Sequence, residues 1–142
     1  MSLYIDIRDA VMTAFDAGFT SPELVIWQRN ESAEVPQPSD EPNWLQINII
    51  MGEERVVGFG TGRTQNERIQ QGIVEIRVFS SFGNGEDRAL ELLSEAASAL
   101  RSYRSGPLSF VGQFAGADDG GTDDGNWWMR GVVVAFEYRF LG

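Results

Sequence analysis

The sequence predicts an α+β fold, in which a mostly antiparallel sheet carries two helices packed on one face and a long hairpin arm. Apolar residues recur at helical spacing in two segments and at the two-residue spacing of strands in others. The helical segments are 3–15 and 86–104, and the main strand segments are 44–51, 69–79 and 127–141. With 142 residues, the chain has the size of one domain, and we expect residues 1–142 to form a single domain.

The first elements follow from local signals. Ser2 can cap the first helix, and Gly18 is expected to stop it. A short apolar run at 24–27 indicates a strand. The segment 28–43 contains three prolines and many polar residues, so we expect an extended loop there.

The arm is predicted between two strands of one hairpin. Residues 44–51 and 69–79 alternate with one buried face, whereas 52–68 carries four glycines and little periodicity. We therefore expect 52–68 to be a mobile loop, with room for a short strand at 56–57. Long glycine-rich excursions of this kind often have a function.

The last third supplies a helix and two strands. Asn84 is a suitable N-cap for the second helix, which Gly106 and Pro107 end. A short strand is expected at 108–114, then an acidic loop at 116–126. The final strand, 127–141, is apolar on both faces as far as residue 135, so we expect it inside the sheet or under another subunit.

Composition narrows the function classes. Neither cysteine nor histidine is present, which removes disulfides, thiolate and Ser-His-Asp mechanisms and the usual zinc and haem ligands. We expect a protein that is not an enzyme and needs no cofactor or metal. The net charge of −10 argues against gripping DNA phosphates. No apolar run is long enough to span a membrane, and the N-terminal residues lack the features of a signal peptide, so we expect folding in the cytoplasm.

Four aspartates form the most obvious charged cluster, Asp118, Asp119, Asp123 and Asp124. Their spacing does not match the calcium-binding loop motif. Three interpretations remain: a solvated flexible loop, a weak cation site, or a loop facing a channel through which a polyanion passes.

The glycine-rich segment around Phe59 is not a phosphate-binding loop, because no lysine follows it and no helix begins after it. Arg55, Arg63 and Arg68 flank it. The segment is either a solvated hairpin tip or a docking arm for a neighbouring subunit or acidic partner. All eleven basic residues are arginines, which reflects coding bias, a preference for arginine at interfaces, or both.

Trp127 and Trp128 are adjacent in one strand, so their side chains point to opposite faces. One of them is expected to be poorly covered in a monomer. An exposed tryptophan is a natural interface anchor, although tryptophans are as often part of a core.

At this point the layout resembles a known family. The resemblance rests on four segments: WLQINIIMGEE from Trp44, an arginine-bearing glycine-rich loop, QQGIVEIRVFSSFGNGEDRALELLSEAASALR, and the terminal DDGNWWMRGVVVAFEYRF. This pattern is similar to the tail terminator proteins of long-tailed bacteriophages, the family of the lambda minor tail protein U. The resemblance covers nearly the whole chain but lies in layout and patterning, not in catalytic residues.

The resemblance implies a structural protein of the virion. It would form a homohexameric ring on the tail tube, stop tube polymerisation and join the tail to the neck and head, while genomic DNA passes through the hole without specific binding. Arg55, Phe59, Arg63, Arg68, Trp127 and Trp128 are the expected contacts to other subunits or the tube, and the four aspartates are expected to line the channel. A neck or tail completion protein is the alternative within the same class; an acidic DNA mimic and a carboxylate-only hydrolase are alternatives from other classes.

Overall fold

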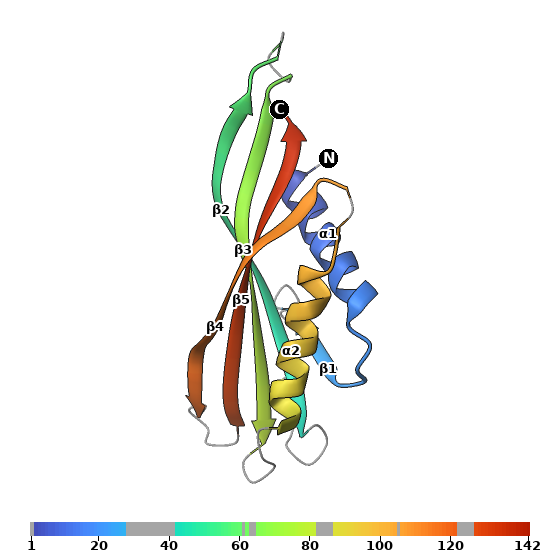
Figure 1. The fold of residues 1–142 in the computed structure, drawn as a ribbon, viewed down its shortest axis with the longest axis vertical. Helices are drawn as coiled ribbons and strands as arrows, with labels where there is room; N and C mark the ends of the chain where they lie inside the picture. The colour runs from blue at the N-terminus through green and yellow to red at the C-terminus, as the bar shows by residue number, and fades with distance from the viewer. Residues whose placement is uncertain are drawn as a thin grey trace.

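The computed structural model shows an elongated molecule in which a twisted sheet is covered on one face by two helices (Figure 1). It describes residues 2–27, 42–60, 62, 65–81, 87–104, 106–121 and 127–142, and only the backbone of 114–121. The elements follow in the order α1 (Leu3–Gly18), β1 (Leu24–Trp27), β2 (Asn43–Gly58), β3 (Glu67–Ser81), α2 (Asp87–Arg101), β4 (Leu108–Gly121) and β5 (Trp127–Leu141). The predicted fold class is confirmed.

The sheet has five strands in the order β1-β2-β3-β5-β4. Only β1 pairs in parallel, along the first residues of β2; the other neighbours are antiparallel. The final strand lies between β3 and β4, in the interior of the sheet, as its two apolar faces predicted.

The main core lies between the sheet and the helices. Ser2 caps α1 by accepting a hydrogen bond from the Ile5 amide at 3.5 Å, and the stripe predicted for this helix is buried. The two helices and four strands contribute side chains that are almost fully buried, such as Ile7, Phe15, Ile76 and Leu92. Each such side chain contributes about 1.5–3 kcal/mol by leaving water, which makes this layer the main source of stability.

The two helices approach each other very closely at one glycine. Gly18 is the last residue of α1, and a Cβ built on it would lie 2.7 Å from the Ala99 Cβ of α2. The helix therefore does end at Gly18. The structure adds a reason that the sequence did not give, because only a residue without a side chain permits this close approach.

A second, smaller core lies on the sheet face opposite α1 and α2. The Trp44 and Phe79 rings stack at 4.2 Å, and the Trp127 ring meets Trp44 edge-on at 5.8 Å. All three are at most 7% exposed. Residues of odd number in β5 face this side, which explains why both faces of that strand are apolar.

Two predicted loops prove to be partly strand. Segment 52–68 was expected to be a mobile loop, but β2 continues to Gly58 and β3 begins at Glu67. Irregularities in the pairing lie between Met51 and Glu54 and between Val56 and Gly58. Such bulges disturb the alternation on which the sequence-based prediction of strands depends, so this stretch was not recognised.

The strand predicted at 108–114 is also longer. Backbone pairing of β4 with β5 continues to Gly121, with Asp119 opposite Arg130. Asp118 and Asp119 therefore belong to a strand and not to the loop in which they were expected. The long partner strand supplies hydrogen bonds that override the glycine and aspartate composition of this segment.

Candidate functional site

The β2–β3 hairpin forms an arm that projects beyond the helices, together with the end of β5 (Figure 1). Two cross-strand features stabilise it, one nearer its base and one near its tip. The Gln70 side chain, 1% exposed, donates to the Gly52 carbonyl at 2.9 Å, and Arg139 pairs with Glu67 at 3.0 Å. The arm is thus a built part of the sheet, held by regular pairing and by side chains of its own chain.

Two arginines predicted to contact a neighbouring subunit are engaged within the chain. Arg55 lies 4.0 Å from Glu137, and Arg68 lies 3.8 Å from Glu54 while donating from Nε to the Gly142 carbonyl at 3.0 Å. These side chains strengthen the arm itself. To contact another subunit as predicted, they would have to release these partners within the chain. Arg63 lies outside the described residues.

The tip of the arm presents an aromatic ring to solvent. Phe59 is 90% exposed, the highest value among the large hydrophobic residues that the structure describes, and Val57 is 43% exposed. A Cβ on Gly60 would lie 2.1 Å from the Gln65 carbonyl oxygen, so only glycine permits this turn. The Gly60 amide also donates to the Asn66 side chain at 3.2 Å. Gly60 and Asn66 thus join the two strands directly after Phe59, whose ring is exposed.

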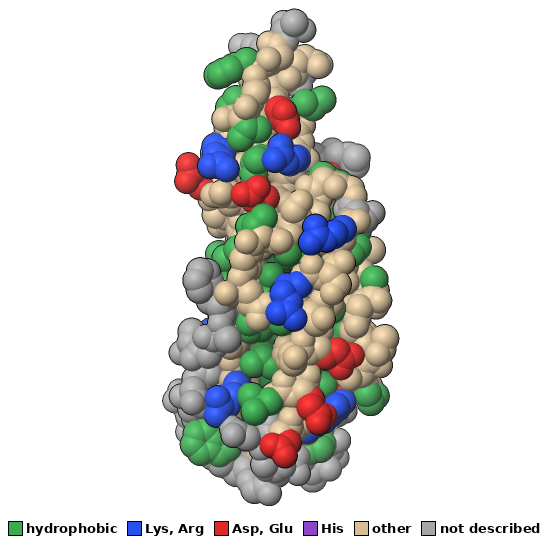
Figure 2. Space-filling model, viewed as in Figure 1, with side chains coloured by type: hydrophobic (Ala, Val, Ile, Leu, Met, Phe, Trp, Pro, Cys, Tyr) green, Lys and Arg blue, Asp and Glu red, His purple; other side chains and the backbone are tan. Residues whose placement is uncertain are grey.

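Figure 2 shows where apolar and charged side chains lie on the arm. Hydrophobic side chains lie on its projecting part, above a zone in which arginines and acidic side chains lie close together. The charged zone coincides with the ion pairs that tie the arm to β5. The exposed side chains of Val57 and Phe59 lie beyond it, whereas other exposed apolar side chains, such as Val111 and Trp128, lie elsewhere on the molecule.

An apolar cleft lies at the base of the arm, between α1 and β2. Its volume is about 520 Å³, and its walls include Tyr4, Ile5 and Arg8 of α1 with Trp27, Ile49 and Met51 of the sheet. Tyr4 is 54% exposed and Ile5 48%, although both belong to a helix that buries its opposite side. The cleft is therefore lined by large side chains that the chain itself does not cover.

The two adjacent tryptophans differ as alternation predicts. Trp127 is 1% exposed inside the second core, whereas Trp128 is 49% exposed. Trp127 is thus part of a core in this chain and does not present its ring for another molecule. Trp128 keeps the exposure that the interface prediction requires.

The predicted channel-lining aspartates are placed only in part. The backbones of Asp118 and Asp119 lie near the end of β4, and nothing is described of their side chains. Asp123 and Asp124 lie outside the described residues. The interpretation of this segment as channel lining stays a prediction.

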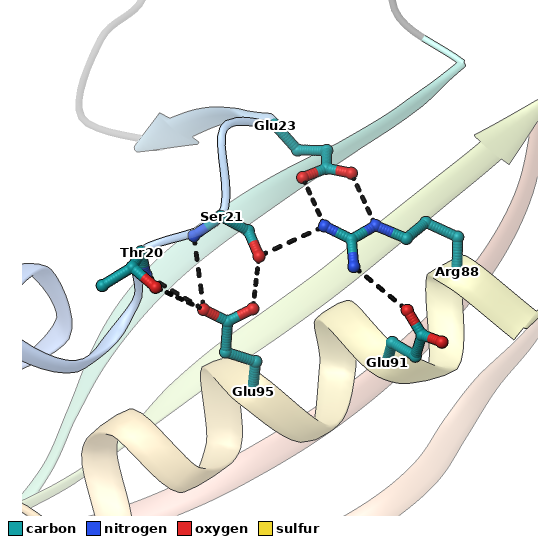
Figure 3. A network of polar contacts seen from close by, with 6 residues as sticks. All are labelled: Thr20, Ser21, Glu23, Arg88, Glu91 and Glu95. Carbon is teal, nitrogen blue, oxygen red and sulfur yellow. Dashed lines mark hydrogen bonds and ion pairs between the residues drawn. The ribbon is translucent and has the colours of Figure 1, made fainter.

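A polar network that the sequence did not reveal joins the α1–β1 connection to α2 (Figure 3). Glu95 accepts hydrogen bonds from the Ser21 hydroxyl and from the amides of Thr20 at 3.0 Å and Ser21 at 3.3 Å. Arg88 donates to both oxygens of Glu23 at 2.8 Å, and also to Glu91 and Ser21. Each of these residues is common on protein surfaces, and their long separation in sequence gave no pattern to recognise.

The network favours charged side chains throughout. The hydrogen bond from Arg88 holds the pKa of Glu23 below its ordinary value, and those from Ser21 and Thr20 do the same for Glu95. Glu23, and then Glu91, raise the pKa of Arg88. The Ser21 hydroxyl donates to Glu95 and accepts from Arg88, so the arrangement fastens the connection onto α2.

Two features are absent from the described part of the chain. There, no group of three or more histidine, cysteine, aspartate or glutamate side chains is arranged to hold a metal ion. Within the same residues, neither helix has the length and apolar character that crossing a membrane requires.

Comparisons with known proteins bear on the fold alone. No protein-family model matches this chain, and no curated protein matches it. Several solved structures match, and one of them aligns with a TM-score of 0.59 and 15% sequence identity, over 94% of this chain and 96% of the other. At this identity the likeness shows a shared fold over nearly the full length of both chains, and it carries no function across.

Proposed function

We propose that this protein is a structural subunit of a phage tail terminator ring, which caps the tail tube, stops its polymerisation and joins it to the neck and head. The observation that carries the proposal is the arm, which extends beyond the helix-covered body and ends in the exposed Phe59. A chain that presents an apolar ring on a projection fits a protein that acts by contacting other subunits.

The asymmetry of the molecule supports a ring. The arm is at one end of the long axis, and the cleft lies on a different surface, between α1 and β2. Contacts between unlike surfaces are head-to-tail, and they produce rings when the rotation closes. The sequence resemblance supplies the expected number of six copies and the tail tube and neck or connector proteins as partners.

The charge supports passage of DNA without specific binding. A net charge of −10 repels a polyanion, and a lumen that repels DNA lets it slide. Under this proposal Asp118, Asp119, Asp123 and Asp124 line the channel. The mature protein is then a component of the virion tail, assembled in the host cytoplasm.

Electron cryomicroscopy of the intact phage particles tests the proposal. We expect a ring of six copies at the head-proximal end of the tail tube. Density for this chain in the neck beyond the end of the tube would instead make it a neck or tail completion protein. Absence of the chain from purified particles would overturn both roles.

A second test uses purified components. Added to polymerising tail tube protein, the chain should bind tube ends and shorten the tubes in proportion to its concentration. Tubes of unchanged length, with the chain remaining in the unbound fraction, would contradict a terminating role.

A further inference from the structure

We propose that two open edges of the sheet pair with each other between copies of this chain: residues 48–54 of β2 with residues 108–113 of β4 in a second copy. The inference rests on the proposed ring and deepens it, because it names the two surfaces that meet at each joint. It starts from the strand order, which leaves backbone groups at both ends of the sheet able to pair with a further strand.

Both edges are open among the described residues. β4 is the last strand of the sheet, so the described strands lie on one side of it only (Figure 1). At the other end, β1 pairs with residues 44–47 of β2 and goes no further, whereas β2 continues to Gly58. Ile50 and Val111, one at each open edge, are 39% and 57% exposed. Each edge is therefore a place where an extended strand can add to the sheet.

The direction and level of the two edges suit a second copy. Each step from β2 through β3 and β5 to β4 is antiparallel, so β2 and β4 run in opposite directions. A neighbour in the same orientation therefore places its β2 antiparallel to β4. The registers put Ile50, Ile73, Ala135 and Gly112 in one row across the four strands, so the two open edges lie at the same level. At residues 44–47 β1 occupies the edge, which confines the joint to the first half of β4.

Charge complementarity favours the same joint. Arg101 and Arg104 line a recess of about 270 Å³ at the start of β4, and neither forms an ion pair with the described residues. Leu108 and Glu54 lie in one row of the sheet, so Glu53 of a neighbour comes to the level of this recess. Glu53 is exposed and likewise forms no ion pair within the described part of the chain. In a protein of net charge −10, the recess is a surface that can receive an acidic edge of another copy.

The sequence of the β4 edge permits pairing over a short length. Residues 108–113 contain no charged residue and no proline, the two features that most often keep an edge strand from pairing. An irregularity between Phe110 and Gly112 limits the regular part of the joint. The joint therefore acts where copies are already held side by side, as on the end of a tube, and there it sets which edge meets which.

Cysteine cross-linking tests the joint, because replacing a side chain keeps the backbone that pairs and the chain has no cysteine of its own. Chains with Ile50→Cys supply the β2 edge, and chains with Val111→Cys supply the β4 edge. The two are mixed with a short thiol-reactive cross-linker, whose reach tolerates a small shift in register. The matched control replaces Val111→Cys with Leu90→Cys on α2, where Leu90 is 41% exposed. Circular dichroism checks that each variant is folded.

We expect the product between positions 50 and 111 to form at least about tenfold faster than the product between positions 50 and 90. It should also form faster than products between two chains of the same variant, because the pairing is head-to-tail. Equal rates for the two mixtures, or products mainly between two Ile50→Cys chains, would overturn the proposal.

Charge reversal tests the part played by the recess. Arg104→Glu in the Val111→Cys chains should slow the mixed product about threefold to tenfold, and Glu53→Arg in the Ile50→Cys chains should restore it. The same Arg104→Glu placed in the Ile50→Cys chains should have no effect, since their own β4 edge is not used. Slowing that is equal from either chain, or that Glu53→Arg does not reverse, would contradict the contact between Glu53 and the recess.

Hydrogen exchange separates this inference from the proposed function. In assembled rings, the backbone amides of residues 48–54 and 108–113 should exchange more slowly than in the free chain, whereas those of residues 44–47 are already paired with β1. If the particles contain the ring but exchange at both edges is unchanged, the edge pairing fails and the ring stands. If the cross-link between positions 50 and 111 forms but the particles lack the chain, the tail role fails and the joint stands.

Discussion

The helix-covered body and the arm use the same residue types in opposite ways. In the body, Phe15 is 2% exposed, stacks on Phe19 at 4.8 Å and meets Trp27 edge-on at 5.6 Å. At the arm tip, Phe59 is 90% exposed. Most of the stabilising burial therefore lies in the body, whereas the tip of the arm contributes little to it.

Replacing a phenylalanine by alanine should affect stability very differently in the two regions, and this is the largest effect that we expect. Phe15→Ala should lower the free energy of unfolding by about 3–5 kcal/mol, because it removes a buried ring and leaves a cavity. Phe59→Ala should change it by less than about 0.5 kcal/mol. Urea unfolding of the two variants measures both values. A loss above about 1 kcal/mol for Phe59→Ala would mean that the tip also stabilises the fold of the isolated chain.

Close packing in the body gives the next effect. Gly18→Ala should cost about 1–3 kcal/mol, since its Cβ would lie 2.7 Å from that of Ala99. The double variant Gly18→Ala with Ala99→Gly should recover only part of that loss, because it removes the Ala99 Cβ but leaves the Ala99 Cα, which would lie 2.8 Å from the added Cβ. Thermal unfolding of both variants tests the contact. A double variant as unstable as the sum of the two single changes would contradict a direct steric conflict.

The polar network should make the body sensitive to acid. The pKa values of Glu23 and Glu95 lie below the ordinary value of 4.5 in the folded chain, so their stabilisation is complete above that pH and is lost as the pH falls through the folded values. Glu95→Gln should cost roughly 1 kcal/mol at pH 7, the low end for hydrogen bonds to a charged group that is partly exposed. It should also flatten the loss of stability below pH 4.5. The measurement is the free energy of unfolding across pH 3–7. Parallel pH profiles for the wild type and the variant would contradict this account.

The smallest effect is expected from the ion pairs of the arm. Arg139 and Glu67 have side chains that are about half exposed, and such pairs contribute between 0 and about 1 kcal/mol. Arg139→Gln should therefore lower stability by less than about 1 kcal/mol, and 1 M salt should remove most of the difference. The check is urea unfolding at low and high salt. A larger loss that persists in salt would show that the arm is coupled to the body more strongly than its exposure implies.

The success of the sequence-based prediction also divides along these two regions. Helix stripes, strand alternation and one short apolar run located the elements of the body, although β4 was predicted to end at residue 114 and continues to Gly121. A helix or strand that buries one face must repeat its apolar residues at a fixed spacing. Adjacent Trp127 and Trp128 had to face opposite ways for the same reason. Which of them would be buried was not predictable, because that depended on Trp44 and Phe79 arriving from distant parts of the chain.

The arm and the network show what only the tertiary structure decided. Bulges near Met51 and Val56 broke the alternation, so a paired strand was taken for a loop. The arginines at 55 and 68 were expected to face another subunit, but β5 and the Gly142 carbonyl lie within their reach. Glu95 and Ser21 lie 74 residues apart and show no motif. Spacing along the chain fixes which face a side chain takes, whereas the identity of its partner depends on which distant segments the fold brings to that face.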